Sequence, residues 1–331
     1  MARRFYINSN GRLRRKENTL YFETEQDGQT IKKALPVNDI DTIYVFGELD
    51  INTKALNYLS QYDIPIHFFN YYGFYSGSFL PRKKNVSGSL LVEQVRHYLD
   101  NNKRQYLAIS FIEGAVHHIL RNLRKNRINP ENYEEIEKDL LPKIFETKTS
   151  EELMAIEGNI RDRYYQLFNR IIKNEDFQME KREKRPPDNP INALISFGNS
   201  IMYNTVLTEI YRTQLDPTIS YLHSPQEKRF SLSLDLAEIF KPFIIDPLIF
   251  SLINTGQISI KDFDKDLNYA YLNESGRKKF LKAYEERLAK TVKHRKLKRK
   301  VSYRQLIRIE CYKLIKHLID DEIYQPFKAW W

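Results

Sequence analysis

The spacing of the hydrophobic residues changes once along this 331-residue chain, at the segment LPRKKNVSGS, residues 80–89. Before it, short stretches rich in aromatic and β-branched residues are separated by Asn, Gly and Asp, a pattern typical of β-strands. After it, apolar residues recur at helical spacing, beginning with a long segment from about 90 to 126. The segment itself is polar, with Pro and Gly, as expected of an exposed connection. The sequence therefore predicts an α+β protein, with a small β-sheet domain over residues 1–85 and a larger all-α domain over residues 86–331.

Local signals refine this division. Stretches such as RRFYINS, NTLYFETE, TIKKALPV and DTIYVFG predict strands, and residues 52–63 predict one helix capped by Asn52. In the second domain, residues 149–174 predict a helix that opens with a capping box from Thr149 to Glu152. The proline-rich segment that follows predicts a surface loop, and the text is helical again from residue 191.

The charge of the chain favours a polyanionic partner. Lys and Arg outnumber Asp and Glu by 53 to 43, which gives a formal charge of +10 and a pI near 9.3. Nucleic acid is the first candidate for such a partner.

Several absences point to an interior compartment. Cys311 is the single cysteine, so no intrachain disulfide can form. The basic N-terminus has no apolar stretch behind it, and the most apolar run, residues 243–253, is too short to span a bilayer. The sequence predicts a cytoplasmic protein without a membrane span.

Three acids and one histidine are the candidates for chemistry. Glu157 lies on or beside the apolar stripe of its helix, where a carboxylate needs an arginine, a metal or a proton, and Gly158 beside it favours close approach of a ligand or backbone. Asp235 and Glu238, three residues apart in SLSLDLAEIF, share one helix face and could meet one ion. Singly, each has an ordinary explanation: an arginine pair for Glu157, a solvated face for the two acids, and ordinary hydrogen bonding for His223.

Their combination is more specific. Two carboxylates and an imidazole suit Mg²⁺ or Mn²⁺, and a basic surface would hold a phosphodiester near that cation. No P-loop, Rossmann glycine pattern, paired-cysteine zinc motif or serine nucleophile elbow occurs, which disfavours nucleotide hydrolysis, redox chemistry and acyl transfer. Metal-dependent phosphodiester chemistry is the hypothesis.

Four segments, in order, resemble one family: AIEGNIRDRYY, KREKRPPDNPINALISFGNSIM, LDPTISYLHS and RFSLSLDLAEIFKP. The family is the CRISPR-associated integrase that captures new spacers, the universal "protein one" nuclease of bacterial and archaeal adaptation modules. The resemblance implies that Glu157, His223 and Glu238 are metal ligands and that Asp235 is a supporting or auxiliary acid. The chain departs from the family at Ser220, where glycine is frequent, and at Phe197 and Asn199, where tyrosines are.

The resemblance also implies a function. It implies a DNA endonuclease and integrase that uses Mg²⁺ or Mn²⁺, in which the 3′-hydroxyl of a captured fragment attacks a phosphodiester at the edge of a repeat. The implied partners are double-stranded DNA, as protospacer fragments and CRISPR repeat, a second copy of the chain bound through the β domain, and the small "protein two" that bridges two dimers. Two alternatives remain open: a nucleic-acid-binding scaffold without catalysis, and a metal-dependent nuclease of repair or RNA turnover without integration.

Basic residues near these motifs are the candidate DNA contacts, because cations position the phosphate backbone. Ordinary solvated cations are an equally good explanation for them. The candidates are Arg182, Lys184, Arg185, Arg229, Lys241, Lys298 and Arg299.

Overall fold

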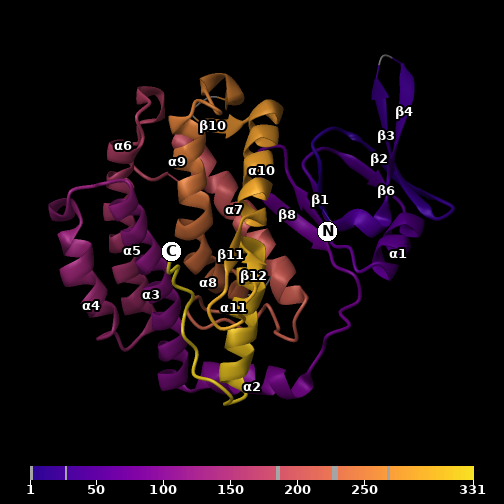
Figure 1. The fold of residues 1–331 in the computed structure, drawn as a ribbon. Helices are drawn as coiled ribbons and strands as arrows, with labels where there is room; N and C mark the ends of the chain where they lie inside the picture. The colour runs from indigo at the N-terminus through magenta and orange to yellow at the C-terminus, as the bar shows by residue number, and fades with distance from the viewer. Residues whose placement is uncertain (1–2, 27, 184–186, 226–229, 267–268) are drawn as a thin grey trace. The chain divides into compact units, whose positions relative to one another are not determined.

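The computed structural model describes residues 3–26, 28–183, 187–225, 230–266 and 269–331. The chain folds into two compact units, Met1–Lys84 and Asn85–Trp331. The first is rich in strands and the second is helical, so the predicted fold class is confirmed (Figure 1). No described helix is long and apolar enough to cross a membrane.

Two four-stranded sheets form the first unit. One has the order β1-β5-β7-β8, with β1, β5 and β7 parallel and β8 antiparallel to β7. The other has the order β4-β3-β2-β6, in which β2 pairs β6 in parallel and the remaining pairs are antiparallel. The strands are β1 (Arg3–Ile7), β2 (Gly11–Lys16), β3 (Thr19–Gln26), β4 (Gln29–Leu35), β5 (Ile40–Val45), β6 (Leu49–Ile51), β7 (Ile66–Phe69) and β8 (Tyr75–Phe79).

The predicted helix of this unit is α1 (Thr53–Gln61), which starts where the sequence places its cap. The Asn52 side chain accepts the Ala55 N–H at 3.0 Å. Strand β2 escapes prediction because its sequence, GRLRRK, has one apolar residue. That residue, Leu13, is fully buried in the core of the unit, so one side chain anchors an otherwise basic strand.

The long helix expected at 90–126 is two helices, α2 (Gly88–Leu99) and α3 (Asn101–Lys125). Asp100 separates them, because its extended backbone ends one helix while its carboxylate caps the next. Its Oδ1 accepts the N–H groups of Asn102 and Lys103 at 2.9 and 3.0 Å.

The rest of the second unit surrounds a central helix, α7, whose residues are buried along nearly its whole length. Helix α8 packs against both α3 and α7 and continues through the π-helical segment η5 into α9. The α-helices are α4 (Leu141–Ile144), α5 (Ser150–Gln166), α6 (Phe168–Ile171), α7 (Pro190–Tyr211), α8 (Ser231–Phe240), α9 (Asp246–Asn254), α10 (Glu274–Ala289) and α11 (Tyr303–Leu318). The 3₁₀ and π segments of the chain are η1 (Val37–Asp39), η2 (Pro130–Asn132), η3 (Glu135–Leu140), η4 (Glu175–Phe177), η5 (Lys241–Ile245) and η6 (Ile260–Asp262).

The second unit is helical, as predicted, and it also carries two small antiparallel sheets that the sequence analysis did not predict. They pair β9 (Phe263–Asp266) with β10 (Tyr269–Leu272), and β11 (Thr291–Lys293) with β12 (Lys300–Ser302). The turn of the second hairpin lies in the basic run KHRKLKRK, where like charges four residues apart would repel one another in a helix. Lys298 closes the turn with a φ of 55°, and its N–H donates to the His294 carbonyl at 2.9 Å.

The last residues return along α3 after α11 ends (Figure 1). Tyr106 donates its hydroxyl to the Tyr324 carbonyl at 2.7 Å, and the Ala329 N–H donates to Nε2 of His118 at 3.2 Å. These bonds hold the C-terminal segment against α3 and bring Trp331 to its last turns, where it accepts a hydrogen bond from Arg121.

Candidate active site

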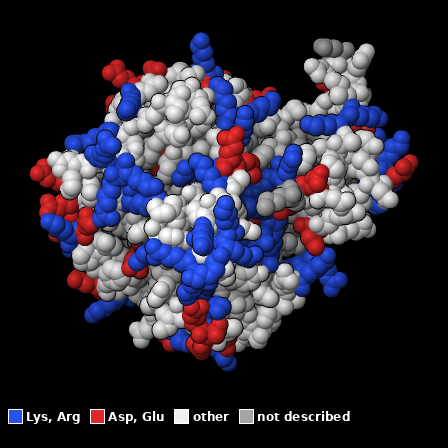
Figure 2. All heavy atoms as spheres, viewed as in Figure 1, with Lys and Arg blue, Asp and Glu red and all other residues white. Residues whose placement is uncertain are grey.

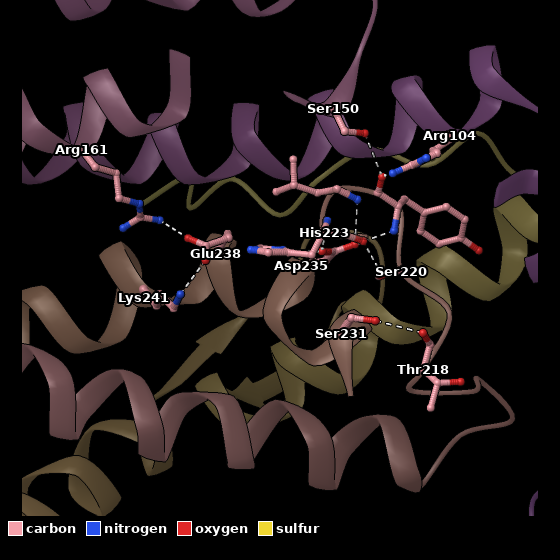
Figure 3. Close-up of polar contacts among 12 residues, drawn as sticks. Arg104, Ser150, Arg161, Thr218, Ser220, His223, Ser231, Asp235, Glu238 and Lys241 are labelled. Carbon is pink, nitrogen blue, oxygen red and sulfur yellow. Dashed lines mark hydrogen bonds and ion pairs between the residues drawn. The ribbon is translucent and has the colours of Figure 1, made fainter. Parts of the chain in front are cut away.

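The loop that carries His223 is held in a fixed turn between α7 and α8 (Figure 3). Nε of Arg104 donates to the Tyr221 carbonyl at 2.9 Å. Ser220 occupies a position where the family that this sequence resembles often has glycine. Its hydroxyl donates to the His223 carbonyl at 2.5 Å. The turn is therefore closed by a side-chain hydrogen bond.

Asp235 supports this loop from α8. Its carboxylate is fully buried and accepts the backbone N–H groups of Tyr221, Leu222 and His223 at 2.7, 3.0 and 3.1 Å. It also contacts Nδ1 of His223 at 2.8 Å. With the hydrogen on Nδ1, the opposite ring nitrogen, Nε2, keeps its lone pair, the arrangement found behind metal-binding histidines. All of these contacts are with the loop, so Asp235 orients His223.

The imidazole of His223 lies between the carboxylates of Asp235 and Glu238 (Figure 3). Burial lowers its pKa, but the hydrogen bond and charge of Asp235, together with the charge of Glu238, outweigh burial and raise it. The side chain is 25% exposed, so one side of the ring remains open to a ligand.

Arg161 joins the two glutamates that the sequence analysis singled out. Its Nε pairs with Glu157, one turn earlier on α5, and its Nη2 pairs with Glu238 on α8. Lys241 Nζ adds a second contact to Glu238 at 2.5 Å (Figure 3). The carboxylates at 157 and 238 therefore converge on one cationic group.

These ion pairs set the ionisation of the site. Burial would raise the pKa of Glu238, yet Lys241 and Arg161 lower it to about 2. Burial would likewise lower the pKa of Arg161, but the charges of Glu238 and Glu157 raise it well above its usual value. Both partners are thus charged at neutral pH.

A further acid lies behind this group at the start of α9. Asp246 is 2% exposed, and burial raises its pKa to about 7 although Arg161 and Tyr164 oppose the rise. One of its carboxylate oxygens, Oδ2, is buried without a hydrogen-bond partner. The sequence analysis did not predict Asp246 as a site residue, because its segment, FIIDPLIF, is otherwise typical of an apolar core.

Sequence reasoning also missed Arg161, although its spacing carried the signal. A cation four residues after Glu157 shares its helix face, which favours an ion pair. The structure thus gives Glu157 the arginine partner that it needs when considered alone. No described residue approaches Gly158 closely in this structure, since a Cβ added there would meet no heavy atom within 4 Å.

The predicted DNA contacts differ in their surroundings. Arg182 turns inward and donates to Asn192 Oδ1 and Ser196 Oγ, both at 3.0 Å. Lys241 belongs to the acid cluster, whereas Lys298 and Arg299 are exposed in the hairpin turn. The other three predicted contacts, Lys184, Arg185 and Arg229, lie outside the described residues.

A sequence model of the family described as CRISPR associated protein Cas1 matches residues 5–286. The chain belongs to the Cas1 family. It is 60% identical over 329 residues to CRISPR-associated endonuclease Cas1 3 of Thermodesulfovibrio yellowstonii, covering 99% of this chain and 100% of that protein. It is also similar to a solved Cas1 protein of Thermotoga maritima, with 42% identity, a TM-score of 0.89, and coverage of 98% of this chain and 99% of that one.

The fold extends to more distant proteins. A casposase bound to integration product has a TM-score of 0.87 at 22% identity, over 99% of this chain and 94% of that one. A Cas6-RT-Cas1–Cas2 complex has a TM-score of 0.84 at 17% identity, over 99% of this chain and 36% of that one. At these identities the likeness concerns the fold alone.

The donor chemistry of this Cas1 site suits a divalent cation, while the side chains do not form a ready cage. Among the described residues, no three His, Cys, Asp or Glu side chains lie together as a metal site. Arg161 accounts for this, because its guanidinium holds the two carboxylates that a metal would need. Two carboxylates already gathered on one cation, beside an imidazole oriented through Nδ1, match the oxygen and nitrogen ligands of Mg²⁺ and Mn²⁺.

Proposed function

We propose that this chain is the metal-dependent DNA endonuclease and integrase of CRISPR spacer acquisition. It inserts captured DNA fragments into the repeat array by attack of a fragment 3′-hydroxyl on a phosphodiester of the repeat. The proposal combines membership of the Cas1 family with the geometry at Glu157, His223 and Glu238. The convergence of Glu157 and Glu238 on one cationic group is the single observation that carries it.

Each residue has a role that follows from its contacts. Glu157 and Glu238 would hold Mg²⁺ or Mn²⁺ together with Nε2 of His223, and Asp235 keeps the imidazole in the tautomer that can do so. When bound, such an ion stabilises negative charge on a phosphoryl oxygen and orients the attacking hydroxyl. Lys241, already at Glu238, is placed to contact a phosphate.

The reaction exchanges one phosphodiester for another. The O–P bond between the 3′-hydroxyl oxygen and the repeat phosphorus forms as the bond from phosphorus to its leaving oxygen breaks, and the proton passes from the attacking to the leaving side. Water in place of the hydroxyl gives strand cleavage at the same site. Both reactions need the same charge stabilisation, so one constellation serves both.

Partners are part of the proposal. We assign double-stranded DNA as the substrate, a homodimer formed through the N-terminal unit, and the small "protein two", Cas2, as the partner that bridges dimers. The resemblance to a casposase bound to integration product and to a Cas1–Cas2 assembly supports this view at the level of fold. A cytoplasmic location stays a prediction.

Two alternatives are separated by one experiment. The chain is incubated with Mn²⁺, a repeat duplex and a fragment that ends in either a 3′-hydroxyl or a 3′-deoxy sugar. An integrase yields branched products from the 3′-hydroxyl fragment alone, whereas a nuclease of repair yields cleavage without branches. A binding scaffold binds the DNA and yields neither product.

A further inference from the structure

Three cations meet where α3 and α10 end against η5. Arg121 and Lys125 lie one turn apart on α3, and Arg287 lies in the last turn of α10. Aromatic rings lie beside Arg121, with Phe243 and Trp331 ring centroids 5.9 Å apart and the Arg121 guanidinium 6.0 Å from a Trp331 ring.

The position of Arg287 is the most constrained of the three. Its Nη2 donates to the Phe243 carbonyl at 2.8 Å, which fixes the guanidinium against η5. Its Nε is buried and has no hydrogen-bond partner. A buried donor of a charged group without an acceptor is costly, so an acceptor that reached this N–H would stabilise the group.

Acidic side chains do not neutralise this group. Among the described residues, no Asp or Glu oxygen lies within 4.0 Å of a charged nitrogen of Arg121, Lys125 or Arg287. Burial and the charges of Arg121 and Arg287 lower the pKa of Lys125, and burial, reinforced by Arg121, lowers that of Arg287 to about 10. The cations therefore repel one another across a short distance.

A helix C-terminus alone does not explain the cluster. Cations in a last turn complement the helix dipole, and this accounts for one such residue on each helix. The neighbouring Arg124 shows the ordinary arrangement, since it pairs with Glu137 on the surface. Two helices bring to one place cations that have no acidic side-chain partner in the described part of the chain, with a buried orphan N–H among them, and this arrangement favours an anion site.

We propose that Arg121, Lys125 and Arg287 bind one phosphate of a DNA strand that runs to the candidate active site. The inference rests on the proposed function, because it takes DNA as the ligand. The connection is structural: Glu238, Lys241 and Phe243 follow one another on the continuous segment α8–η5, so the phosphate site and the acid cluster share one helical support. Lys and Arg gather on the visible face, over the end of α10 and the β11–β12 hairpin, and would extend the track (Figure 2).

The test measures DNA binding against salt in EDTA, so that no cleavage occurs. The variants are Lys125→Gln and Arg287→Gln, and Arg124→Gln is the matched control on the same helix. Loss of one phosphate contact lowers the slope of log K against log salt by about 0.9. We expect that decrease and a several-fold weaker affinity at low salt for both variants, with the slope of Arg124→Gln unchanged.

Folding is controlled by urea denaturation. We expect Arg287→Gln to be at least as stable as the parent chain, because it removes an unpaired buried charge; a structural role predicts the reverse. If that variant does not fold, the exposed Lys125 decides by itself. A parallel arm measures the rise in Tm produced by inorganic phosphate, which the two cluster variants should lose and Arg124→Gln should keep.

The outcomes separate the two claims. Unchanged salt slopes in both cluster variants, while the parent chain binds DNA and cleaves it with Mn²⁺, overturn the phosphate site and leave the proposed function standing. Loss of the phosphate-induced rise in Tm with unchanged DNA slopes also overturns it, since the site would then take free phosphate. A parent chain that binds no DNA overturns both.

Discussion

Arg161 on α5 pairs with Glu238 on α8, and the same guanidinium holds Glu157. Arg161 and Glu238 are 77 positions apart in the sequence, and the guanidinium neutralises two partly buried carboxylates. Removing a partner from a buried pair is strongly destabilising, because it leaves an uncompensated charge. The site therefore holds a resident cation, and under the proposed function a divalent metal ion would have to replace it.

Arg161→Gln should strengthen metal binding while it weakens the fold. Without the guanidinium, the two carboxylates are free to hold Mn²⁺, so we expect at least a ten-fold lower Kd by isothermal titration. The free energy of unfolding without metal should fall by about 3 kcal/mol. Arg163→Gln is the control, since Arg163 pairs with Glu135 at the surface of the same helix. A Kd equal to or weaker than that of the parent chain would show that Arg161 does not compete with the ion.

Glu157→Gln should lower the rates of Mn²⁺-dependent cleavage and strand transfer by at least about 100-fold, because a site of few protein ligands loses one of them. DNA binding in EDTA should persist, since the basic surface is untouched. Glu151→Gln, on the exposed first turn of α5, should behave as the parent chain. Activity of Glu157→Gln near the parent level would remove Glu157 from the site.

The pH dependence should report the contact between His223 and Asp235. A metal-binding imidazole must be unprotonated, and Asp235 raises the pKa of His223, so activity should fall on the acid side at a higher pH than it would with an unperturbed histidine. In Asp235→Asn the acid-side fall in activity should move to lower pH, because the carboxylate charge that raises the pKa of His223 is gone. Metal affinity should also drop about 10–100-fold through loss of ring orientation. An unmoved acid limb of kcat/KM would contradict this account.

Asp246→Asn should change how stability varies with pH. The folded-state pKa of Asp246 is raised from 3.8 to about 7, so the folded chain binds this proton more tightly than the unfolded chain. Its contribution is fully present below about pH 4 and is lost as pH rises through about 7. Urea denaturation should therefore show the parent chain losing up to about 4 kcal/mol relative to Asp246→Asn over that window. Asp162→Asn, an exposed acid on α5, should show no such trend.

Gly158→Ala should stabilise the chain by about 1 kcal/mol, because alanine is the better helix former and the added methyl meets no atom within 4 Å. Gly198→Ala is the contrasting variant, since its Cβ would lie 2.6 Å from Cγ2 of Ile245 and should destabilise the fold. A loss of stability in Gly158→Ala would mean that the open space beside Glu157 is filled in solution.

Much of the fold follows from local signals. Asn52 marks the start of α1, and Thr149 that of α5, where it accepts the Glu152 N–H at 3.2 Å. The reciprocal half of the expected capping box is absent, because the Glu152 carboxylate takes the N–H of Lys148. The predictions fail where a single buried side chain fixes an element, as Leu13 does in the otherwise basic strand β2.

The site was harder to derive, because its contacts join distant segments. Their spacing placed Asp235 and Glu238 on one face of a helix. In the structure, Asp235 accepts backbone N–H groups of the loop at 221–223, whereas Glu238 pairs with Arg161. That difference depends on how the loop packs over α8, which no local pattern records. Asp246 was hidden for the same reason, since the charged and polar groups that act on it come from α5, α8 and η5.

The most direct test is anomalous diffraction from crystals soaked in Mn²⁺. The account predicts one peak bound by the carboxylates of Glu157 and Glu238 and by Nε2 of His223, with the Arg161 guanidinium turned away from both glutamates. A peak bound by other residues, or no peak under conditions where the soaked protein still cleaves DNA, would contradict it.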